Sequence, residues 1–171
     1  MNKAVFLDRD GVINECALLH GKPSAPTQIQ NFILFPGVLE AISEFKIRGF
    51  FVFVITNQPD ISKGNLSQED LFQMHTNLME AAEIDDIFVC PHLEIHNCFC
   101  RKPKIGMIKD AQKKYSINLQ KSFVVGDRWR DVEAAKNAGC TSILVGTGYN
   151  EKKITPDFQV NSLVECLKII R

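Results

Sequence analysis

Residues 50–55 form an unbroken apolar run that directly follows Gly49. A strand that is apolar at every position is expected where helices cover both faces of a sheet. Other short apolar runs alternate along the chain with segments of helical period. This alternation predicts βαβ units with right-handed crossovers. The expected fold class is therefore α/β, with a parallel Rossmannoid sheet between two layers of helices.

The same patterns locate the individual elements. Strands are predicted at residues 4–7, 50–55, 86–90, 122–125 and 141–145. Helices are predicted at residues 36–48, 67–83, 103–115, 131–138 and 162–170. Two stretches, 15–31 and 91–104, match no regular element, and long loops inside a compact domain usually have a function. Because no insert is longer than these, we expect no large cap domain over the sheet.

Size and composition are those of an ordinary globular protein, with 171 residues, of which 45% are hydrophobic and 23% charged. We expect a single domain spanning residues 1–171. The formal net charge of zero gives no electrostatic reason to expect nucleic acid or a membrane as a partner. We expect neither a signal peptide nor a membrane span, and hence a cytoplasmic location. In that compartment the six cysteines are expected to be metal ligands or core residues rather than disulfides.

Two acids, Asp8 and Asp10, follow the first predicted strand, and Gly11 comes next. In an open α/β sheet, ligands bind at the carboxyl ends of the strands. Two carboxylates at this spacing can share a divalent cation, or divide the roles of nucleophile and acid/base. Turns and calcium loops use the same residue types, so this pattern needs support from elsewhere in the chain.

Polar residues at other predicted strand ends supply that support. Thr56 follows the second strand, Lys102 lies in the loop at 91–104, and Asp127 follows the fourth strand. A metal held by Asp8 and Asp127 would neutralise the charge of a phosphate. Asp8 would then attack phosphorus, and Asp10 would act as acid and base. Thr56 and Lys102 would hold the phosphoryl oxygens.

Four segments in order are similar to the four motifs of the haloacid dehalogenase (HAD) superfamily. They are Asp-Arg-Asp-Gly-Val-Ile-Asn (8–14), Ile-Thr-Asn-Gln (55–58), Cys-Arg-Lys-Pro-Lys (100–104) and Val-Gly-Asp-Arg-x-x-Asp (125–131). More narrowly, the chain resembles the small zinc-containing phosphatases, which act on D-glycero-D-manno-heptose 1,7-bisphosphate or histidinol phosphate. The resemblance covers nearly the whole chain and implies a phosphatase that works through an aspartyl phosphate.

The resemblance also implies individual roles. Asp8 matches the nucleophile and Asp10 the acid/base, while Thr56 and Lys102 match the phosphoryl stabilisers. The implied magnesium ligands are Asp8, Asp10 through its backbone carbonyl, and Asp127. The substrate, a small phosphorylated metabolite, is expected to contact Arg9, Asn57, Gln58, Arg101 and Arg128.

Cys90, His92, Cys98 and Cys100 form a C-x-H-x₅-C-x-C pattern. Three thiolates and one imidazole complete a tetrahedral zinc shell with no position open for water, which predicts a structural zinc in a loop at about 90–102. The resembling phosphatases have the same ligand set. His96 is a weaker candidate ligand, and the alternative interpretation is three buried cysteines beside an exposed histidine.

Some questions stay open in the sequence. Asp131 either caps its helix or supports the metal site, Trp129 is expected to pack rather than line the crevice, and the remaining cysteines have no assigned role. Residues 12–14 and 61–64 are similar to the heptose type, which we favour as a 1,7-bisphosphate 7-phosphatase. The spacing at 92–98 is similar to the histidinol-phosphate type. A phosphate- or metal-binding module without turnover is the alternative of a different class.

Overall fold

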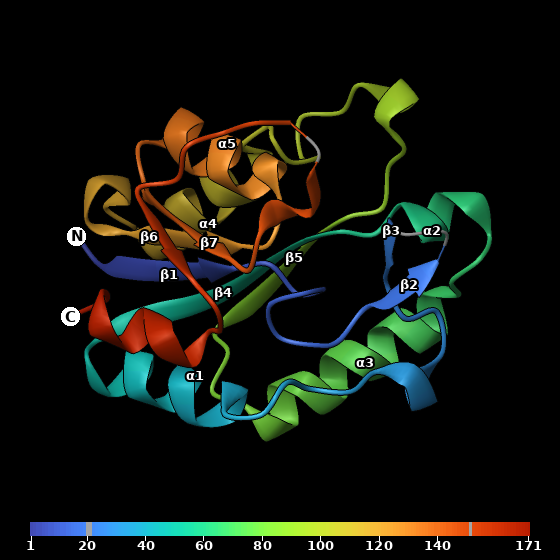
Figure 1. Cartoon of the computed structure of the whole chain (residues 1–171), viewed down its shortest axis with the longest axis horizontal. Helices are drawn as coiled ribbons and strands as arrows, with labels where there is room; N and C mark the ends of the chain where they lie inside the picture. Colours follow the sequence, from blue (N-terminus) through green and yellow to red (C-terminus); the bar gives the residue numbers. More distant parts are fainter. Residues whose placement is uncertain (20–21, 151) are drawn as a thin grey trace.

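The computed structural model describes residues 1–19, 22–150 and 152–171. Six strands pair into one parallel sheet in the order β5-β4-β1-β6-β7-β8 (Figure 1). The strands are β1 Lys3–Leu7, β4 Phe50–Asn57, β5 Asp86–Cys90, β6 Phe123–Gly126, β7 Thr141–Val145 and β8 Phe158–Val160. The predicted parallel α/β sheet is confirmed, with β1 at its centre.

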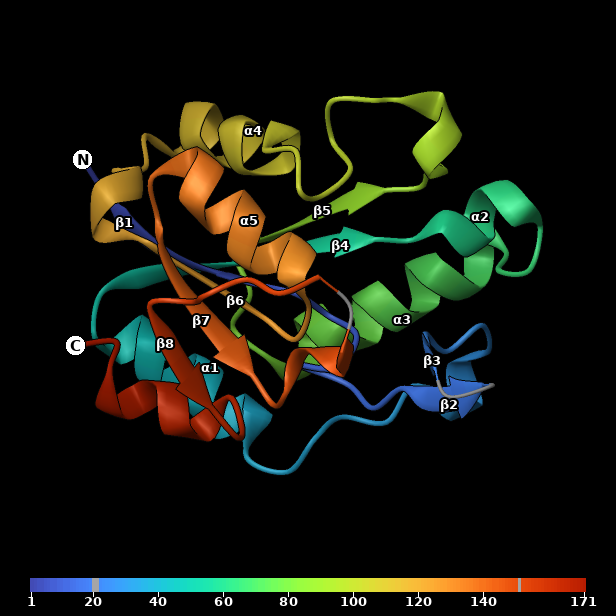
Figure 2. The same cartoon turned by 45° about the horizontal axis from the view of Figure 1, so that its top comes forward.

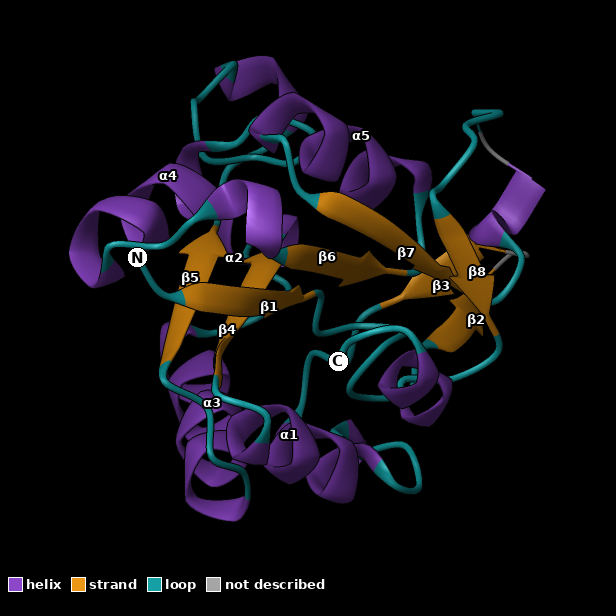
Figure 3. Ribbon diagram, turned by 90° about the vertical axis from the view of Figure 1, so that its left-hand side faces the viewer, coloured by secondary structure: helices purple, strands orange, loops and turns teal. Residues whose placement is uncertain are grey.

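Helices cover both faces of this sheet (Figure 3). On one face lie α1 Val38–Ile47, α3 Gln68–Ala81 and the 3₁₀ helix η5 Val164–Lys168, and on the other lie α4 Gly106–Tyr115 and α5 Trp129–Ala138. Successive side chains of a strand point to opposite faces. Val5 and Leu7 therefore join the core beneath α1, whereas Ala4 and Phe6 join the core beneath α4 and α5. Every one of these four side chains is fully buried, which explains the continuous apolar runs.

The turn after β1 is pressed directly against the end of β6. Gly11 has a φ of +85°, and a Cβ at this position would lie 2.0 Å from Oδ2 of Asp127. Glycine is required both for the left-handed conformation and for the close approach. The Asp8 N–H donates to the carbonyl of Val125 at 2.9 Å, which fixes the start of the turn. The Asp-x-Asp-Gly segment is thereby held at the carboxyl ends of the central strands.

Several short elements differ from the sequence prediction. The stretch 15–31 contains a hairpin of β2 Ala17–Leu19 and β3 Lys22–Ser24, and a short helix α2 Pro59–Lys63 follows β4 (Figure 2). The strand β8 was not predicted. Three-residue strands are too short to show a periodic pattern, which explains why β2, β3 and β8 were missed.

Two predicted helices are shorter in the structure. The helix predicted at 103–115 begins at Gly106, because the N–H of Lys104 donates to Arg101 and that of Gly106 to Phe99, which closes the preceding loop. The helix predicted at 162–170 is the 3₁₀ turn η5 instead. Nη1 of Arg48 donates to the carbonyls of Leu167 and Ile170, both at 2.6 Å, and so satisfies groups that an α-helix end leaves exposed.

The prediction that the fold has no large cap is confirmed. Across the described ranges, the strands are connected by the helices that cover the sheet. At the edge of the site these connections carry, in addition, the β2–β3 hairpin, the short helix α2 and short 3₁₀ turns. Within those same ranges, no helix combines the length and the apolar character needed to cross a membrane.

Candidate active site

A cavity of about 440 Å³ opens at the carboxyl ends of the central strands. Asp8 and Asp10 line it from the turn after β1, Asp127 from the end of β6, and Lys102 from the loop after β5. Arg128 also lines it. The parallel sheet therefore brings together three segments that are distant in the sequence, as expected for strands whose carboxyl ends meet at one edge.

Two acids of the cavity pair with one buried ammonium. Nζ of Lys102 lies 2.9 Å from Oδ1 of Asp8 and 2.7 Å from Oδ1 of Asp131. It also donates to the carbonyl of Ile55 at 2.8 Å. Burial works against the charge on Lys102, but the two carboxylates hold the pKa of its ammonium above the usual range. Lys102 is thus a fixed positive charge that three acceptors orient.

The donor set fits a hard divalent cation. Asp8, Asp127 and Asp131 each offer a carboxylate oxygen, and these oxygens lie within 4.8 Å of one another. Asp127 is 3% exposed, and its Oδ1 is buried without a hydrogen-bond partner among the described residues. Such an oxygen is costly to bury unless a cation or water satisfies it. Carboxylate oxygens are the ligands that magnesium prefers, so these three residues could hold that ion.

Asp10 does not belong to this group of three carboxylates and is held by other side chains. Its Oδ1 accepts from Nη2 of Arg9 at 2.8 Å and from Nδ2 of Asn14 at 3.0 Å. Its Oδ2 accepts from Nε2 of Gln58 at 2.6 Å. Two carboxylates of the same turn therefore occupy different environments, which is the arrangement that two distinct chemical roles require.

The predicted contacts of Arg9 and Gln58 with substrate need correction. Both side chains are fully buried and neither lines the cavity. Arg9 and Gln58 instead bind Asp10, so their contact with a ligand is indirect. Thr56 is also fully buried, and its hydroxyl accepts from Nε2 of Gln58 at 2.8 Å.

Asn57 and Arg101 line the cavity together with Arg128. The Asn57 side chain also clamps the backbone of Lys102. Its Oδ1 accepts from the Lys102 N–H at 3.0 Å, and its Nδ2 donates to the Lys102 carbonyl at 3.2 Å. The end of β4 thereby positions the loop that carries the buried ammonium.

The Cys/His cluster forms a compact group beside the cavity. Sγ of Cys90 lies 3.6 Å from Sγ of Cys98, which lies 3.4 Å from Sγ of Cys100. Nδ1 of His92 lies 3.6 Å from the Cys90 sulfur and 3.2 Å from the Cys100 sulfur. Ligands of a tetrahedral zinc lie about 3.5–3.8 Å apart, so the four residues fit this ion.

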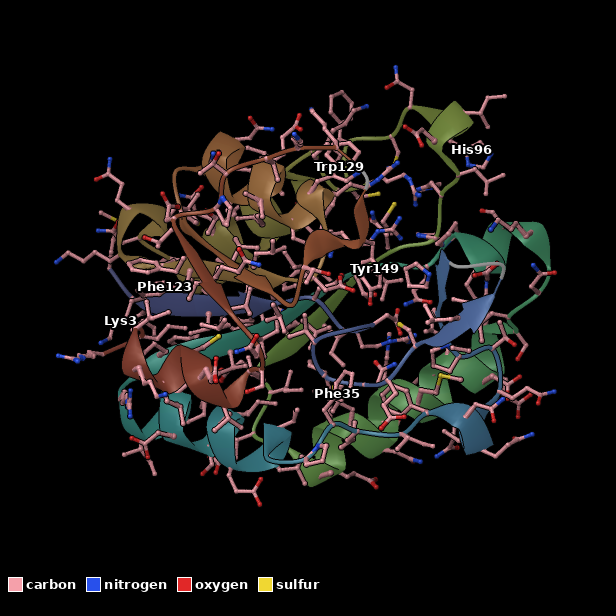
Figure 4. The ribbon with its side chains drawn as sticks, viewed as in Figure 1. Lys3, Phe35, His96, Phe123, Trp129 and Tyr149 are labelled. Carbon is pink, nitrogen blue, oxygen red and sulfur yellow. The ribbon has the colours of Figure 1, made fainter. Side chains whose placement is uncertain are left out.

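His96 does not belong to this group of ligands. It lies at the outer end of the loop, in the 3₁₀ turn Glu94–His96 (Figure 4), and its Nδ1 accepts from the Leu93 N–H at 3.1 Å. The group that could hold a metal therefore contains His92 and not His96, which agrees with the preference drawn from the sequence spacing.

Three features of the site were open or absent in the sequence analysis. Asp131 caps its helix, because its Oδ2 accepts from the Arg128 N–H at the start of α5. Its Oδ1 pairs with Lys102, and its carboxylate belongs to the group that could hold a metal. Trp129 packs against the charged groups of neighbouring side chains and does not line the cavity, as predicted. Tyr149 was not predicted as part of the site, yet burial and the nearby charge of Asp127 raise the pKa of its phenol to about 12.

The acid cluster makes stability depend on pH and on the metal. Burial and the neighbouring acids Asp131 and Asp10 raise the pKa of Asp8 from 3.8 to about 7, against the effect of Lys102. Burial, Asp8 and Asp131 raise that of Asp127 to about 8. In the metal-free protein these groups keep protons that the unfolded chain releases above pH 3.8. Their contribution to stability is therefore complete in acid and is lost as the pH rises through about 7 to 8.

We expect the free energy of unfolding of the metal-free protein to fall between about pH 5 and about pH 8, by up to roughly 1.4 kcal/mol per pH unit for each group, and the Tm to fall with it. Magnesium is expected to raise the Tm more at the higher pH, because it no longer competes with protons. Scanning calorimetry in chelator and in magnesium measures both effects. Asp127→Asn is expected to flatten the pH dependence, and a Tm that rises over this interval would contradict the assignment.

The chain is similar in sequence to a family of hydrolases and to known phosphatases. A family model described as HAD-hydrolase-like matches residues 99–166. The D-glycero-beta-D-manno-heptose-1,7-bisphosphate 7-phosphatase of Photorhabdus laumondii is 36% identical, covering 98% of this chain and 95% of that protein. The D-glycero-alpha-D-manno-heptose-1,7-bisphosphate 7-phosphatase of Campylobacter jejuni is 33% identical, covering 99% and 96%.

A solved structure shows the same relationship in three dimensions. The crystal structure of the D,D-heptose 1,7-bisphosphate phosphatase from Bordetella bronchiseptica, complexed with magnesium and phosphate, superposes with a TM-score of 0.84. It is 29% identical and covers 98% of this chain and 97% of its own. Sequence, fold and site together show that the chain belongs to the D-glycero-D-manno-heptose 1,7-bisphosphate phosphatase family of HAD-like hydrolases.

Proposed function

We propose that this protein removes the 7-phosphate of D-glycero-D-manno-heptose 1,7-bisphosphate in a magnesium-dependent reaction. One observation carries the proposal: two acids of a single turn are held in different ways at one cavity. Asp8 pairs with the buried ammonium of Lys102, whereas Asp10 is bound by Arg9 and Gln58. A nucleophile and a separate acid/base are what phosphate ester hydrolysis through a covalent intermediate needs.

In the first step a carboxylate oxygen of Asp8 forms a bond to phosphorus, and the bond between phosphorus and the sugar oxygen breaks. Asp10 gives its proton to the departing sugar oxygen. In the second step Asp10 takes a proton from a water molecule, which attacks the phosphorus and releases inorganic phosphate from Asp8. Lys102 stays in place through both steps, where its charge stabilises the phosphoryl oxygens.

We assign two metals to the residues that fit them. Asp8 and Asp127, with the backbone carbonyl of Asp10 and with Asp131 alongside, would hold magnesium, which when bound neutralises charge on the phosphoryl group. The Cys₃His group would hold a structural zinc, whose role is to order the loop that ends in Arg101 and Lys102.

The cavity also suits a substrate with a second phosphate. Its wall carries four further cations besides the buried ammonium, namely Lys63, Arg101, Arg128 and Arg130. Arginine side chains bind phosphate with paired N–H groups and are favoured at such sites. Because no cap covers the cavity, a terminal phosphate has access to Asp8, and the other end of a short sugar lies near this wall.

A substrate panel tests the proposed specificity. We expect kcat/KM for heptose 1,7-bisphosphate, assayed as both anomers, to exceed that for histidinol phosphate by roughly 10²-fold or more. Heptose 7-phosphate is the matched control, since it lacks only the phosphate at C1. It is expected to show a higher KM, because it leaves the cationic wall without a partner.

An advantage for histidinol phosphate would contradict the choice of sugar and favour the other member of the phosphatase class. Absence of magnesium-dependent turnover on every phosphomonoester would contradict catalysis itself and favour a binding module. Phosphate release measured with and without chelator separates these outcomes.

A further inference from the structure

The buried Arg9 side chain links the acid Asp10 to a histidine that lies in none of the four motifs. Arg9 directs Nε and Nη2 to Oδ1 of Asp10, at 3.1 and 2.8 Å. Its third nitrogen, Nη1, lies 3.1 Å from Nε2 of His75. The face of the guanidinium lies 5.4 Å from the centre of the Phe32 ring. Arg9 is therefore enclosed, with Asp10 on one edge and His75 on the other.

His75 is placed by the packing of α3. The buried face of this helix comprises Leu71, Met74 and Leu78, and His75 lies beside it, next to Met74. The helix runs beside the turn that follows β1 (Figure 2), and the imidazole of His75 reaches Arg9 from this helix. Since His75 does not line the cavity, it has no direct contact with a ligand there.

The chemistry of the contact fixes the state of His75. A guanidinium has five N–H donors and no acceptor, so Nε2 of His75 must accept and the imidazole must be neutral. Burial and the charge of Arg9 lower the pKa of His75 to about 4, in agreement with this requirement. His75 thus supplies a permanent acceptor to a guanidinium whose side chain has no exposure to solvent.

The same contacts identify the working oxygen of Asp10. Its Oδ1 accepts from two nitrogens of Arg9 and from Nδ2 of Asn14, which is at 3.0 Å. A carboxylate oxygen has about two lone pairs, so Oδ1 has no capacity left to carry a proton. Among the described residues, Oδ2 accepts a hydrogen bond only from Gln58, at 2.6 Å, which leaves it one lone pair. The proton that Asp10 transfers must therefore be on Oδ2.

We propose that His75 is a positioning residue for catalysis, which fixes Arg9 and thereby keeps Oδ1 of Asp10 occupied and Oδ2 directed at the leaving oxygen. The inference rests on the proposed phosphatase function, in which Asp10 protonates that oxygen. Without the His75 acceptor, a buried N–H of Arg9 loses its partner, and the guanidinium is expected to shift. The hydrogen bonds from Arg9 to Asp10 are then weakened, although Asp8, Lys102 and the proposed metal ligands are unchanged.

The dependence on leaving group distinguishes this role from a purely structural one. A primary alkoxide, as from glycerol 3-phosphate, needs a proton to depart, whereas 4-nitrophenolate does not. We expect His75→Leu to lower kcat/KM for glycerol 3-phosphate by roughly 10- to 100-fold, within the range that general acid catalysis contributes. For 4-nitrophenyl phosphate we expect a change below about threefold, because this kinetic constant does not depend on proton donation.

Two conservative variants and a control complete the experiment. His75→Gln is expected to behave as the parent, because its amide oxygen reaches the position of Nε2. His75→Asn, one methylene shorter, is expected to show the same leaving-group dependence as His75→Leu. Gln73→Leu, on the exposed side of the same helix, controls for the apolar replacement. If His75→Leu does not fold, the comparison of the Gln and Asn variants decides the question alone.

Equal losses on the two esters, or equal behaviour of His75→Gln and His75→Asn, would overturn the proposal. Because both esters are generic, a wrong choice of sugar for the natural substrate leaves this test intact. Absence of magnesium-dependent turnover by the parent on both esters would instead contradict the phosphatase function, and the inference with it.

Discussion

Replacing Asp8 with asparagine is expected to lower kcat by roughly 10⁴-fold or more, because an amide cannot form the aspartyl phosphate. Nucleophile removal is the largest single loss expected at this site. Phosphate monoesters are among the slowest substrates to hydrolyse without a catalyst. Lys102, Asp10 and the proposed metal ligand Asp127 would remain in this variant, but they would have no attacking group to assist.

The Asp8→Asn variant is expected to fold. Its side-chain oxygen can still accept from the Arg9 N–H and from Lys102, which lie 2.8 and 2.9 Å from Oδ1 of Asp8. Burial already disfavours the charged form of Asp8, so a neutral amide is compatible with this environment. The loss of activity is therefore expected without a comparable loss of secondary structure by circular dichroism.

Mass spectrometry of acid-quenched protein provides the direct measurement. The parent is expected to carry phosphate on Asp8 during turnover, and the asparagine variant none. Asp110→Asn, on the exposed face of α4, makes the same chemical change away from the cavity and is expected to keep full activity. If Asp8→Asn hydrolyses a phosphomonoester as fast as the parent, the covalent mechanism is wrong.

The sequence was sufficient to predict this site because strand ends are predictable. Apolar runs located β1, β4 and β6, and a parallel sheet places the carboxyl ends of its strands along one edge. Asp8 and Asp127 could therefore be placed together without any structure. The Cys/His spacing was similarly informative, since four metal-binding side chains within one short loop are typical of a zinc site.

Contacts between distant helices and buried charges could not be predicted in this way. Arg9 lies between Asp8 and Asp10 in the sequence, and it was predicted to contact the substrate. Its hydrogen-bond partner His75 is 66 residues away in the chain, which the sequence pattern does not reveal. The helical period of α3 indicated a buried face but not which residue of the turn after β1 it would meet. One signal was available in the sequence. In an extended segment, successive side chains point to opposite sides, so if Asp8 and Asp10 face the cavity, Arg9 is expected to point into the protein.

Loop closure explains the error at the start of α4. Pro103 favours a helix beginning nearby, and the sequence pattern follows that preference. In the structure, the backbone N–H groups of Lys104 and Gly106 are used to close the loop that carries Lys102. Because these hydrogen bonds close the loop, the helix begins only at Gly106, and loop closure overrides local helix propensity here.

Removing zinc is the second change for which we expect a large effect. The loop between β5 and α4 has little core of its own, since its apolar side chains Ile95 and Phe99 are 85% and 86% exposed. Metal binding contributes on the order of 10–16 kcal/mol to the folding of zinc-finger peptides, which also lack a core. We expect a strong chelator, or Cys100→Ser, to disorder this loop and to lower the Tm of the protein.

Activity is expected to fall with the loss of order, because Lys102 is only two residues beyond the ligand Cys100. A displaced Lys102 removes one fixed charge from the transition state, which costs about 10²–10³-fold in kcat. Asn57 would still bind the Lys102 backbone, at 3.0 Å from its N–H, and this contact limits the loss. Elemental analysis of chelator-free protein should give about one zinc per chain.

Cys140→Ser is the matched control, since Cys140 is 7% exposed in the core beneath α5 and outside the Cys/His group. It is expected to lower stability slightly while the zinc content and kcat stay at the parental values. A folded, active and zinc-free protein would contradict the structural role. Equal activity of Cys100→Ser and Cys140→Ser would show that the position of Lys102 does not depend on the metal. The two results together separate the presence of zinc from its effect on catalysis.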